Sequence, residues 1–332
     1  MKKIVIIKLG ALGDLVRTLS VLPAIKDKYP ESEITWITRK NALEVFEGNP
    51  HVKKLFALPY NFSEKEFDIL YNFDVDEEAT KLASEIQAKE KYGFYSDGGF
   101  ASAFNLPAEY YLNTIFDDNL KKTNKKTYQE MMFQVAELNY KKQHCPIFLN
   151  STDKKYATDF VEKNKISTEN LIGIHIGASS RWPSKVWHIE ELKKFIRLAK
   201  SKGYEIIIFA GNDEKESQKK LIDELIKEGL AVFKNNPENT IKQFASLVNI
   251  CKVLVCSDSL ALHVSLSLKK PTVGLFFCTS ANEIEDYGVL KKLVSVKLCD
   301  FFPEKMNEYD ENLTKSISAE TVFNTVENIL KN

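Results

Sequence analysis

The chain has 332 residues, of which 44% are hydrophobic and 11% aromatic, and it carries 46 basic and 46 acidic side chains. This length predicts two folded domains, and the zero net charge provides no overall field that would attract nucleic acid. The five cysteines include no close pair, which argues against a disulfide framework or a zinc site. No apolar run is long enough for a signal peptide or a transmembrane helix, so we expect a cytoplasmic protein.

The N-terminal half alternates strand and helix patterns. Residues 3–9 are a β-branched apolar run typical of a buried parallel strand, and a turn containing Gly10 follows. Apolar residues then recur at helical spacing from Asp14 to Lys28, which predicts one helix. This alternation predicts a doubly wound α/β domain. Further strands are expected at 34–38, 52–58, 67–73 and 92–95, with helices at 76–89 and 127–138 and an irregular segment at 96–126.

The second half repeats this architecture. The composition changes over residues 139–153, so we expect an N-terminal domain of residues 1–150 and a C-terminal domain of residues 151–332. A second apolar strand, residues 171–176, again leads into a glycine turn. Three strand–helix units follow, and a strand at 272–276 is expected to close the sheet. The last helix, residues 318–331, is expected to pack back on the N-terminal domain.

Two Rossmann-like domains of this kind are expected to face each other across a cleft at the carboxyl ends of their strands, where ligands bind. A two-lobed glycosyltransferase, a dinucleotide oxidoreductase and a non-catalytic nucleotide or sugar binder all fit such a cleft. The oxidoreductase is disfavoured because Gly10 and Gly13 do not have the G-x-G-x-x-G spacing.

Four stretches carry a resemblance to a known family. The opening KLGALGD at residues 8–14 is followed by the stretch RWPSKVW at 181–187, and SDSLALH at 257–263 precedes KKPTVGLF at 269–276. In this order they resemble the motifs of glycosyltransferase family 9, the lipopolysaccharide heptosyltransferases. The family usually has glycine at the position of Leu260, and G-P-T where this chain has Phe277, Cys278 and Thr279. These departures leave open the donor sugar, and whether the activity is kept.

The resemblance implies an inverting glycosyltransferase with the GT-B fold. The N-terminal domain would bind the acceptor, and the C-terminal domain would bind a nucleotide-sugar donor, most simply ADP-heptose, for transfer onto a lipopolysaccharide or lipooligosaccharide core. It implies no cofactor and no metal, and a glycolipid acceptor implies peripheral contact with the inner face of the cytoplasmic membrane. A non-catalytic nucleotide-sugar-binding protein and a transferase for a different sugar nucleotide are the alternatives.

Asp14 is the candidate catalytic residue, because inverting transfer needs a base that takes the proton of the acceptor hydroxyl. Helix capping is its alternative role, and Gly10 and Gly13 shape the acceptor-side loop before it. Lys185 is the candidate cation for the leaving diphosphate, a role that Arg181 could share or replace. The spacing does not decide whether Glu214 or Glu216 binds the ribose. Further donor contacts are expected from Ser179, Ser180, Asp258, Ser259, Leu260 and His263.

Overall fold

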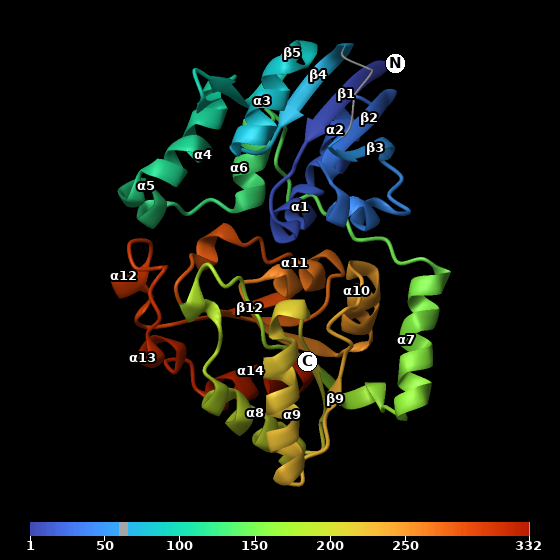
Figure 1. Ribbon diagram of the computed structural model, residues 1–332, viewed down its shortest axis with the longest axis vertical. Coiled ribbons are helices and arrows are strands. Elements are labelled where there is room, and N and C mark those ends of the chain that lie inside the picture. Colours follow the sequence, from blue (N-terminus) through green and yellow to red (C-terminus); the bar gives the residue numbers. More distant parts are fainter. Residues whose placement is uncertain (60–65, 332) are drawn as a thin grey trace. The chain divides into compact units, whose positions relative to one another are not determined.

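A computed structural model describes residues 1–59 and 66–331 and divides the chain into two units (Figure 1). Unit 1 comprises Met1–Phe148 together with Asn282–Glu285, and unit 2 comprises Leu149–Ala281 with Asp286–Asn332. Each unit contains one six-stranded sheet and its own helices. The expected fold class, two doubly wound α/β domains, is confirmed.

The sheet of unit 1 has the strand order β3-β2-β1-β4-β5-β6, with β1 to β5 parallel and β6 antiparallel to β5. Its order reverses between β1 and β4, and ligands bind at such a switch point in folds of this type. The strands are β1 (Lys2–Ile7), β2 (Ser32–Arg39), β3 (Val52–Leu58), β4 (Glu66–Asn72), β5 (Gln87–Asp97) and β6 (Phe100–Ala103). The helices are α1 (Leu12–Thr18), α2 (Val21–Lys28), η1 (Lys40–Phe46), α3 (Glu77–Glu85), α4 (Leu106–Phe116), α5 (Asp118–Thr123) and α6 (Tyr128–Val135).

The sheet of unit 2 is parallel throughout, with the order β12-β11-β10-β7-β8-β9 and its switch point between β7 and β10. The strands are β7 (Leu171–His175), β8 (Glu205–Phe209), β9 (Phe233–Lys234), β10 (Val253–Ser257), β11 (Thr272–Phe276) and β12 (Leu290–Val294). The longer helices are α7 (Ser151–Asn164), α8 (Ile189–Ser201), α9 (Lys215–Lys227), α10 (Ile241–Ile250), α11 (Leu260–Ser267) and α14 (Ala319–Lys331). The short ones are η2 (Thr168–Asn170), η3 (Pro183–Lys185), η4 (Asn212–Glu214), η5 (Ala281–Glu283), α12 (Leu298–Phe301) and α13 (Glu311–Thr314).

The helix expected between Asp14 and Lys28 is broken into α1 and α2. Pro23 lies in the first turn of α2 and has no N–H to donate to the carbonyl of Leu19, with which its ring would also clash in a continuous helix. Ser20 Oγ instead donates to the Arg17 carbonyl at 2.9 Å. The break confines Asp14 to a short helix that begins directly after the β1 turn.

Four further expectations are corrected. The segment 96–126 is not irregular, because it contains β6, α4 and α5, and residues 87–89 belong to β5 rather than to the preceding helix. The strand β11 does not close the sheet of unit 2, since β12 pairs with its outer edge. The last helix packs in unit 2: Val322, Phe323 and Val326 of α14 are part of the core that contains residues of α8 and β10.

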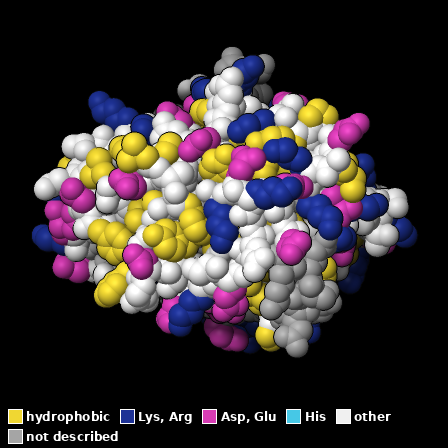
Figure 2. Space-filling view, turned by 90° about the horizontal axis from the view of Figure 1, so that it is seen from above, with side chains coloured by type: hydrophobic (Ala, Val, Ile, Leu, Met, Phe, Trp, Pro, Cys, Tyr) yellow, Lys and Arg dark blue, Asp and Glu magenta, His cyan; other side chains and the backbone are white. Residues whose placement is uncertain are grey.

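Several large apolar side chains are exposed on unit 1. Phe100 of β6 and both Leu106 and Phe116 of α4 are largely exposed, and the space-filling view shows apolar side chains gathered on one part of the visible face (Figure 2). In the described part of the chain, no helix combines the length and the apolar character that a membrane span requires.

Candidate functional site

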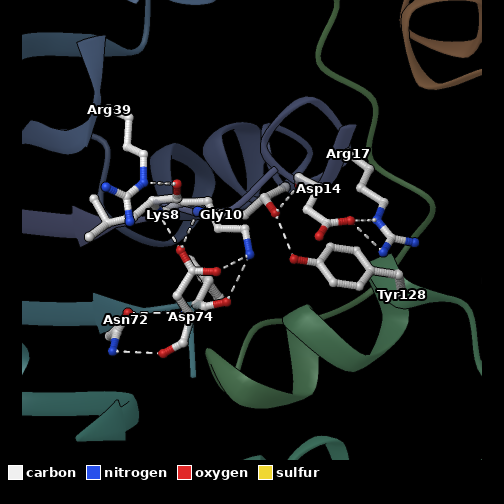
Figure 3. A network of polar contacts seen from close by, with 11 residues as sticks. Lys8, Gly10, Asp14, Arg17, Arg39, Asn72, Asp74 and Tyr128 are labelled. Atoms are coloured by element: carbon white, nitrogen blue, oxygen red, sulfur yellow. Dashed lines mark hydrogen bonds and ion pairs between the residues drawn. The ribbon is translucent and has the colours of Figure 1, made fainter. Parts of the chain in front are cut away.

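The turn after β1 is fixed to the end of β4 by one carboxylate (Figure 3). Asp74 Oδ1 lies 2.5 Å from Lys8 Nζ, and Asp74 Oδ2 accepts the backbone N–H groups of Leu9 and of Gly10, the latter at 2.9 Å. Asn72 in turn accepts the backbone N–H of Asp74 at 3.1 Å. Because β1 and β4 are neighbours, these contacts hold the turn at the switch point of the sheet.

The ion pair between Lys8 and Asp74 is buried. The side chains of Lys8 and Asp74 are 3% and 7% exposed. Burial lowers the pKa of Lys8, but Asp74, with smaller contributions from Tyr128, Asp14 and Tyr111, more than offsets this effect, and the pKa lies well above its usual value. A Cβ atom on Gly10 would stand 3.0 Å from Asp74 Oδ1, so glycine permits the close approach of the turn to this carboxylate.

Asp14 lies in the first turn of α1, two residues after its first residue. The N-cap position itself is occupied by Ala11, which makes no side-chain cap bond. Arg17 Nε and Nη2 donate to Asp14 Oδ1 at 3.1 and 2.7 Å, and the Asp14 side chain is 39% exposed. Asp14 is therefore a partly exposed carboxylate on the helix that follows the switch point of unit 1. Gly13 precedes it in the same turn of the helix.

Arg17, Tyr128 and Asp74 belong to this site although they were not among the residues singled out from the sequence. The spacing of Arg17, three residues after Asp14 in a helix, could have indicated the ion pair. Asp74 directly follows the expected strand 67–73, where ligand-binding residues of parallel sheets are found. Nothing in the sequence indicates Tyr128, because its contact depends on how α6 packs against α1.

In unit 2, Lys185 and Asp258 form a buried ion pair. Lys185 Nζ lies 3.0 Å from Asp258 Oδ2, and the two side chains are 9% and 15% exposed. Lys185 Nζ also lies 4.5 Å from the centre of the Trp182 ring. The neighbouring Ser184 fixes η3, because its Oγ donates to the Glu308 carbonyl at 2.8 Å and accepts the N–H of Asp310 at 2.9 Å.

The amino end of α11 stands at the switch point of this second sheet. Ser259 is the N-cap residue, and its Oγ is buried without a hydrogen-bond partner in the part of the chain that the structure describes, as is Oγ1 of Thr279 after β11. His263 lies one turn into the helix, with Nε2 3.9 Å from Asp258 Oδ1. Burial raises the pKa of Cys278 to about 11, against the opposing effect of the nearby Lys185 ammonium. A cation, a helix terminus and two unpartnered hydroxyls therefore come from adjoining segments.

Leu260 is the first residue of α11 and is half-buried, so its side chain stands at the entrance of this helix.

The three donor candidates Ser179, Ser180 and Arg181 lie on the exposed loop between β7 and η3. Ser179 Oγ accepts the N–H of Arg181 at 3.4 Å, and the Arg181 guanidinium lies 5.1 Å from the Trp182 ring centre. Lys185, in contrast, is buried with Asp258. The two cations that the sequence left as alternatives, Lys185 and Arg181, thus differ in burial: Lys185 is enclosed and Arg181 is exposed.

Glu214 joins the loops that follow β7 and β8. Its Oε2 accepts the N–H of Gly211 at 2.9 Å, and its carboxylate occupies the place of a side chain at Gly177, where a Cβ would stand 2.3 Å from Cδ of Glu214. Burial raises the pKa of Glu214. Glu216 is exposed on α9, so Glu214 is the glutamate placed at the strand ends.

A small cavity opens beside these loops, lined by residues at the ends of β7 and β10. His175 lies at its edge, with Nδ1 3.1 Å from the Gly177 carbonyl oxygen and its ring edge-on to Phe244 of α10. Burial lowers the pKa of His175 to about 4, so the ring is neutral at neutral pH. Among the described residues, no three or more His, Cys, Asp or Glu side chains are grouped so as to hold a metal ion.

Comparison with known proteins gives a consistent match. Residues 55–305 match the sequence profile of glycosyltransferase family 9 (heptosyltransferase). The chain is 22% identical over 311 residues to lipopolysaccharide core heptosyltransferase OpsX of Haemophilus influenzae, over 89% of this chain and 84% of that protein. A glycosyl transferase family 9 structure from Veillonella parvula superposes with a TM-score of 0.80 at 20% identity, over 99% and 97% of the two chains. The ADP-heptose lipopolysaccharide heptosyltransferase II of E. coli superposes with a TM-score of 0.73 at 17% identity, over 100% and 99%.

Proposed function

The chain belongs to glycosyltransferase family 9 and is a glycosyltransferase, and from this premise we propose that it transfers heptose from ADP-heptose to a lipopolysaccharide or lipooligosaccharide core, with inversion. The proposed donor and acceptor are those named for its relatives. One structural observation carries the proposal for this chain. The Lys185 and Asp258 pair, the amino end of α11 and the Ser259 hydroxyl lie together at the switch point of unit 2.

This group of residues suits a sugar diphosphate. The Lys185 ammonium and the free backbone N–H groups at the start of α11 attract phosphate oxygens. Asp258 would be repelled by phosphate, so we assign it to the hydroxyl groups of the sugar, and His263 would donate to a phosphate oxygen. The buried hydroxyls of Ser259 and Thr279 have no hydrogen-bond partner among the described residues, and a bound donor would supply one.

The nucleoside would lie toward β8. We assign Glu214 to the ribose hydroxyls, because a half-buried carboxylate at the end of this strand accepts their hydrogen bonds. The small residue Gly177 leaves room for that carboxylate. Ser179, Ser180 and Arg181, on the exposed loop next to Gly177, are assigned to the outer phosphate oxygens.

Asp14 is proposed as the general base. Its carboxylate would take the proton of the acceptor hydroxyl while the acceptor oxygen forms a bond to the anomeric carbon and the bond from that carbon to the diphosphate oxygen breaks. The electron pair of that bond leaves with ADP, whose added charge Lys185 and α11 would stabilise. A single displacement of this kind inverts the anomeric configuration. In this proposal, unit 1 holds the acceptor, with Gly10 and Gly13 shaping the loop around it, and unit 2 holds the donor.

The proposed acceptor is a glycolipid. We therefore also propose that the protein makes peripheral contact with the inner face of the cytoplasmic membrane. We assign this contact to Phe100, Leu106 and Phe116 of unit 1, which are largely exposed apolar side chains. Sedimentation with vesicles of anionic phospholipid would test it, and we expect the wild-type protein to bind them more strongly than a variant with these three residues changed to serine.

A panel of sugar nucleotides tests the proposed donor. Purified protein is heated with ADP-heptose, ADP-glucose, UDP-glucose or GDP-mannose, and we expect the largest rise in Tm with ADP-heptose because a ligand stabilises the state that binds it. The same donors are then incubated with core lipopolysaccharide that lacks heptose, and product is detected by mass. Transfer from a different sugar nucleotide alone would change the assigned donor. Leu260, which stands at the start of α11 where the family usually has glycine, would then be the residue that accounts for the change. Binding without transfer to this acceptor would contradict the proposed acceptor.

A further inference from the structure

The roles assigned above to unit 1 use Asp14 but not the two side chains packed beside it, Arg17 and Tyr128 (Figure 3). We propose that Arg17, seated on the ring of Tyr128, is a positioning residue that keeps the Asp14 carboxylate ionised and fixed in orientation when the acceptor covers it. This inference rests on the proposed role of Asp14 as the base. It assigns a function to a contact that the sequence motif does not define.

The geometry is that of a clamp. Two nitrogen atoms of one guanidinium, Nε and Nη2, donate to the same carboxylate oxygen, Asp14 Oδ1, at 3.1 and 2.7 Å. Two donors of one rigid, planar guanidinium that converge on the same oxygen restrain the position of that oxygen more closely than a single ammonium does. Arg17 itself engages only one of the two carboxylate oxygens.

The Arg17 guanidinium is itself held in place by Tyr128. The Arg17 guanidinium lies 3.6 Å from the centre of the Tyr128 ring, a cation–π contact in a region where Tyr128 is buried. The Tyr128 hydroxyl lies 3.0 Å from Thr18 Oγ1, which donates to the carbonyl of Asp14 at 2.6 Å. Tyr111 of α4 packs edge-on against Tyr128. Arg17 is therefore fixed by α1, α4 and α6 together.

Binding of an acceptor creates the need for such a residue. The Asp14 side chain is 39% exposed, whereas Arg17 is only 13% exposed. An acceptor placed on Asp14 removes its water, and loss of water raises the pKa of a carboxyl group. A protonated Asp14 cannot take the proton of the acceptor hydroxyl. The buried positive charge of Arg17 opposes this change, because charges interact more strongly where solvent is excluded.

Other charged or titratable groups face this pair in the described part of unit 1, and each differs from Arg17 in its partners or its charge. Lys8 at the end of β1 is also near Asp14, but its ammonium is bound to Asp74. Burial raises the pKa values of Tyr111 and Tyr128, so both hydroxyls stay neutral at physiological pH. Burial lowers the pKa of Arg17, but the carboxylates of Asp14 and Glu283 help to raise it, so Arg17 stays charged.

The test measures the titration of Asp14 directly. Protein labelled with ¹³C at the aspartate carboxyl carbons is titrated by NMR, and the Asp14 signal is identified by its loss in Asp14→Asn. In Arg17→Met we expect the titration midpoint of Asp14 to rise by about one pH unit, and the spectrum also shows whether the variant is folded. Arg197→Met is the matched control, because Arg197 also donates through Nε and Nη2 to one carboxylate, that of Glu228, at 2.8 Å for each donor, although to its two different oxygens and on the exposed surface of unit 2. It should leave the Asp14 midpoint unchanged.

Kinetics with ADP-heptose and heptose-free core lipopolysaccharide supply the second readout. Arg17→Lys keeps the charge but loses the two-donor fork, so we expect a normal Asp14 midpoint with kcat lowered about tenfold and an unchanged KM for ADP-heptose. An unmoved Asp14 midpoint in Arg17→Met, or a wild-type kcat in Arg17→Lys, overturns the inference alone. Full activity in Asp14→Asn overturns the proposed base, whatever the titration shows.

Discussion

At the scale of single residues, the proposed donor site depends on where one charge is buried. Lys185 and Arg181 are four positions apart, but only Lys185 is enclosed with a carboxylate at the ends of the strands. A buried ammonium retains its attraction for phosphate, whereas an exposed guanidinium is screened by water and salt. The two residues should therefore differ in their effects on donor binding.

We expect Lys185→Met to weaken ADP binding by about tenfold to a hundredfold, the size of a lost hydrogen bond to a charged group, as measured by isothermal titration calorimetry. Lys242→Met is the matched control, because Lys242 is also a buried lysine of unit 2 that pairs with an aspartate, Asp153, away from the site. Weaker binding in Arg181→Met but not in Lys185→Met would show that Arg181 is the phosphate-binding cation.

His175 should make the stability of unit 2 depend on pH. Burial lowers its pKa to about 4, although a hydrogen bond to Gly177 opposes the shift. The unfolded chain thus binds this proton at a higher pH than the folded one, so stability is complete above about pH 6.5 and falls as the pH drops toward 4. Since the residue as a whole is only partly buried, we expect a loss of about 1–2 kcal/mol.

Urea unfolding at pH 7 and pH 4.5 tests this dependence. In His175→Gln the difference between the two free energies of unfolding should be smaller by that amount than in the wild type. An equal pH dependence in both proteins would show that His175 is not the responsible group.

At the scale of elements, the site in unit 1 depends on how β1, β4 and α1 are joined. The turn after β1 has no regular structure of its own, and Asp74 supplies its hydrogen bonds and neutralises the buried Lys8. The break between α1 and α2, which precedes Pro23, then limits Asp14 to a helix of seven residues. Asp14 is therefore presented by a turn anchored to a neighbouring strand rather than by a long helix.

Asp74→Asn should destabilise unit 1 by about 3 kcal/mol, because it leaves the buried Lys8 ammonium without its negative partner. Urea unfolding followed by hydrogen exchange in β1 and β4 measures this loss. The double variant Lys8→Met with Asp74→Asn removes both charges and should recover part of it. Equal stability of the single variant and the wild type would mean that the pair does not anchor the turn.

The elements were predicted from sequence where local signals were strong. The strands that lead into the two glycine turns and the helix after Asp258 follow from apolar runs and from motif positions. The break at Pro23 was missed because the apolar spacing continues through it, and α4 was missed because its aromatic residues do not form a clear apolar stripe. The partners Tyr128 and Asp74 depend on packing between segments far apart in the sequence, which no local pattern records.

At the scale of the whole molecule, the chain passes between the two units more than once. The segment Asn282–Glu285 lies in sequence between β11 and β12 of unit 2, but belongs to unit 1. Glu285 is 3% exposed there, accepts the Tyr140 hydroxyl at 2.5 Å and pairs with Lys142 at 3.1 Å. Unit 1 is therefore incomplete without a segment that follows most of unit 2 in the chain.

Glu285→Ala should accordingly lower the stability of unit 1, by about 1–3 kcal/mol for the loss of buried hydrogen bonds. Hydrogen exchange read by mass spectrometry should become faster in peptides from β1, β4 and α6, while peptides from β7 and β10 stay protected. Glu285→Gln, which can still accept the Tyr140 hydroxyl, should show a smaller effect. Faster exchange confined to β11 and β12 would contradict the assignment of this segment to unit 1.

The central claim, transfer of heptose with Asp14 as the base, is tested most directly by comparing kcat for Asp14→Asn and wild type with ADP-heptose and heptose-free core lipopolysaccharide. Asparagine has nearly the same shape but cannot take the proton. We predict that kcat falls about a thousandfold, while the Kd for ADP, measured on the same preparation, is unchanged. A variant that keeps a tenth or more of the wild-type kcat, as a rough threshold set by the size of general-base effects, would contradict the claim.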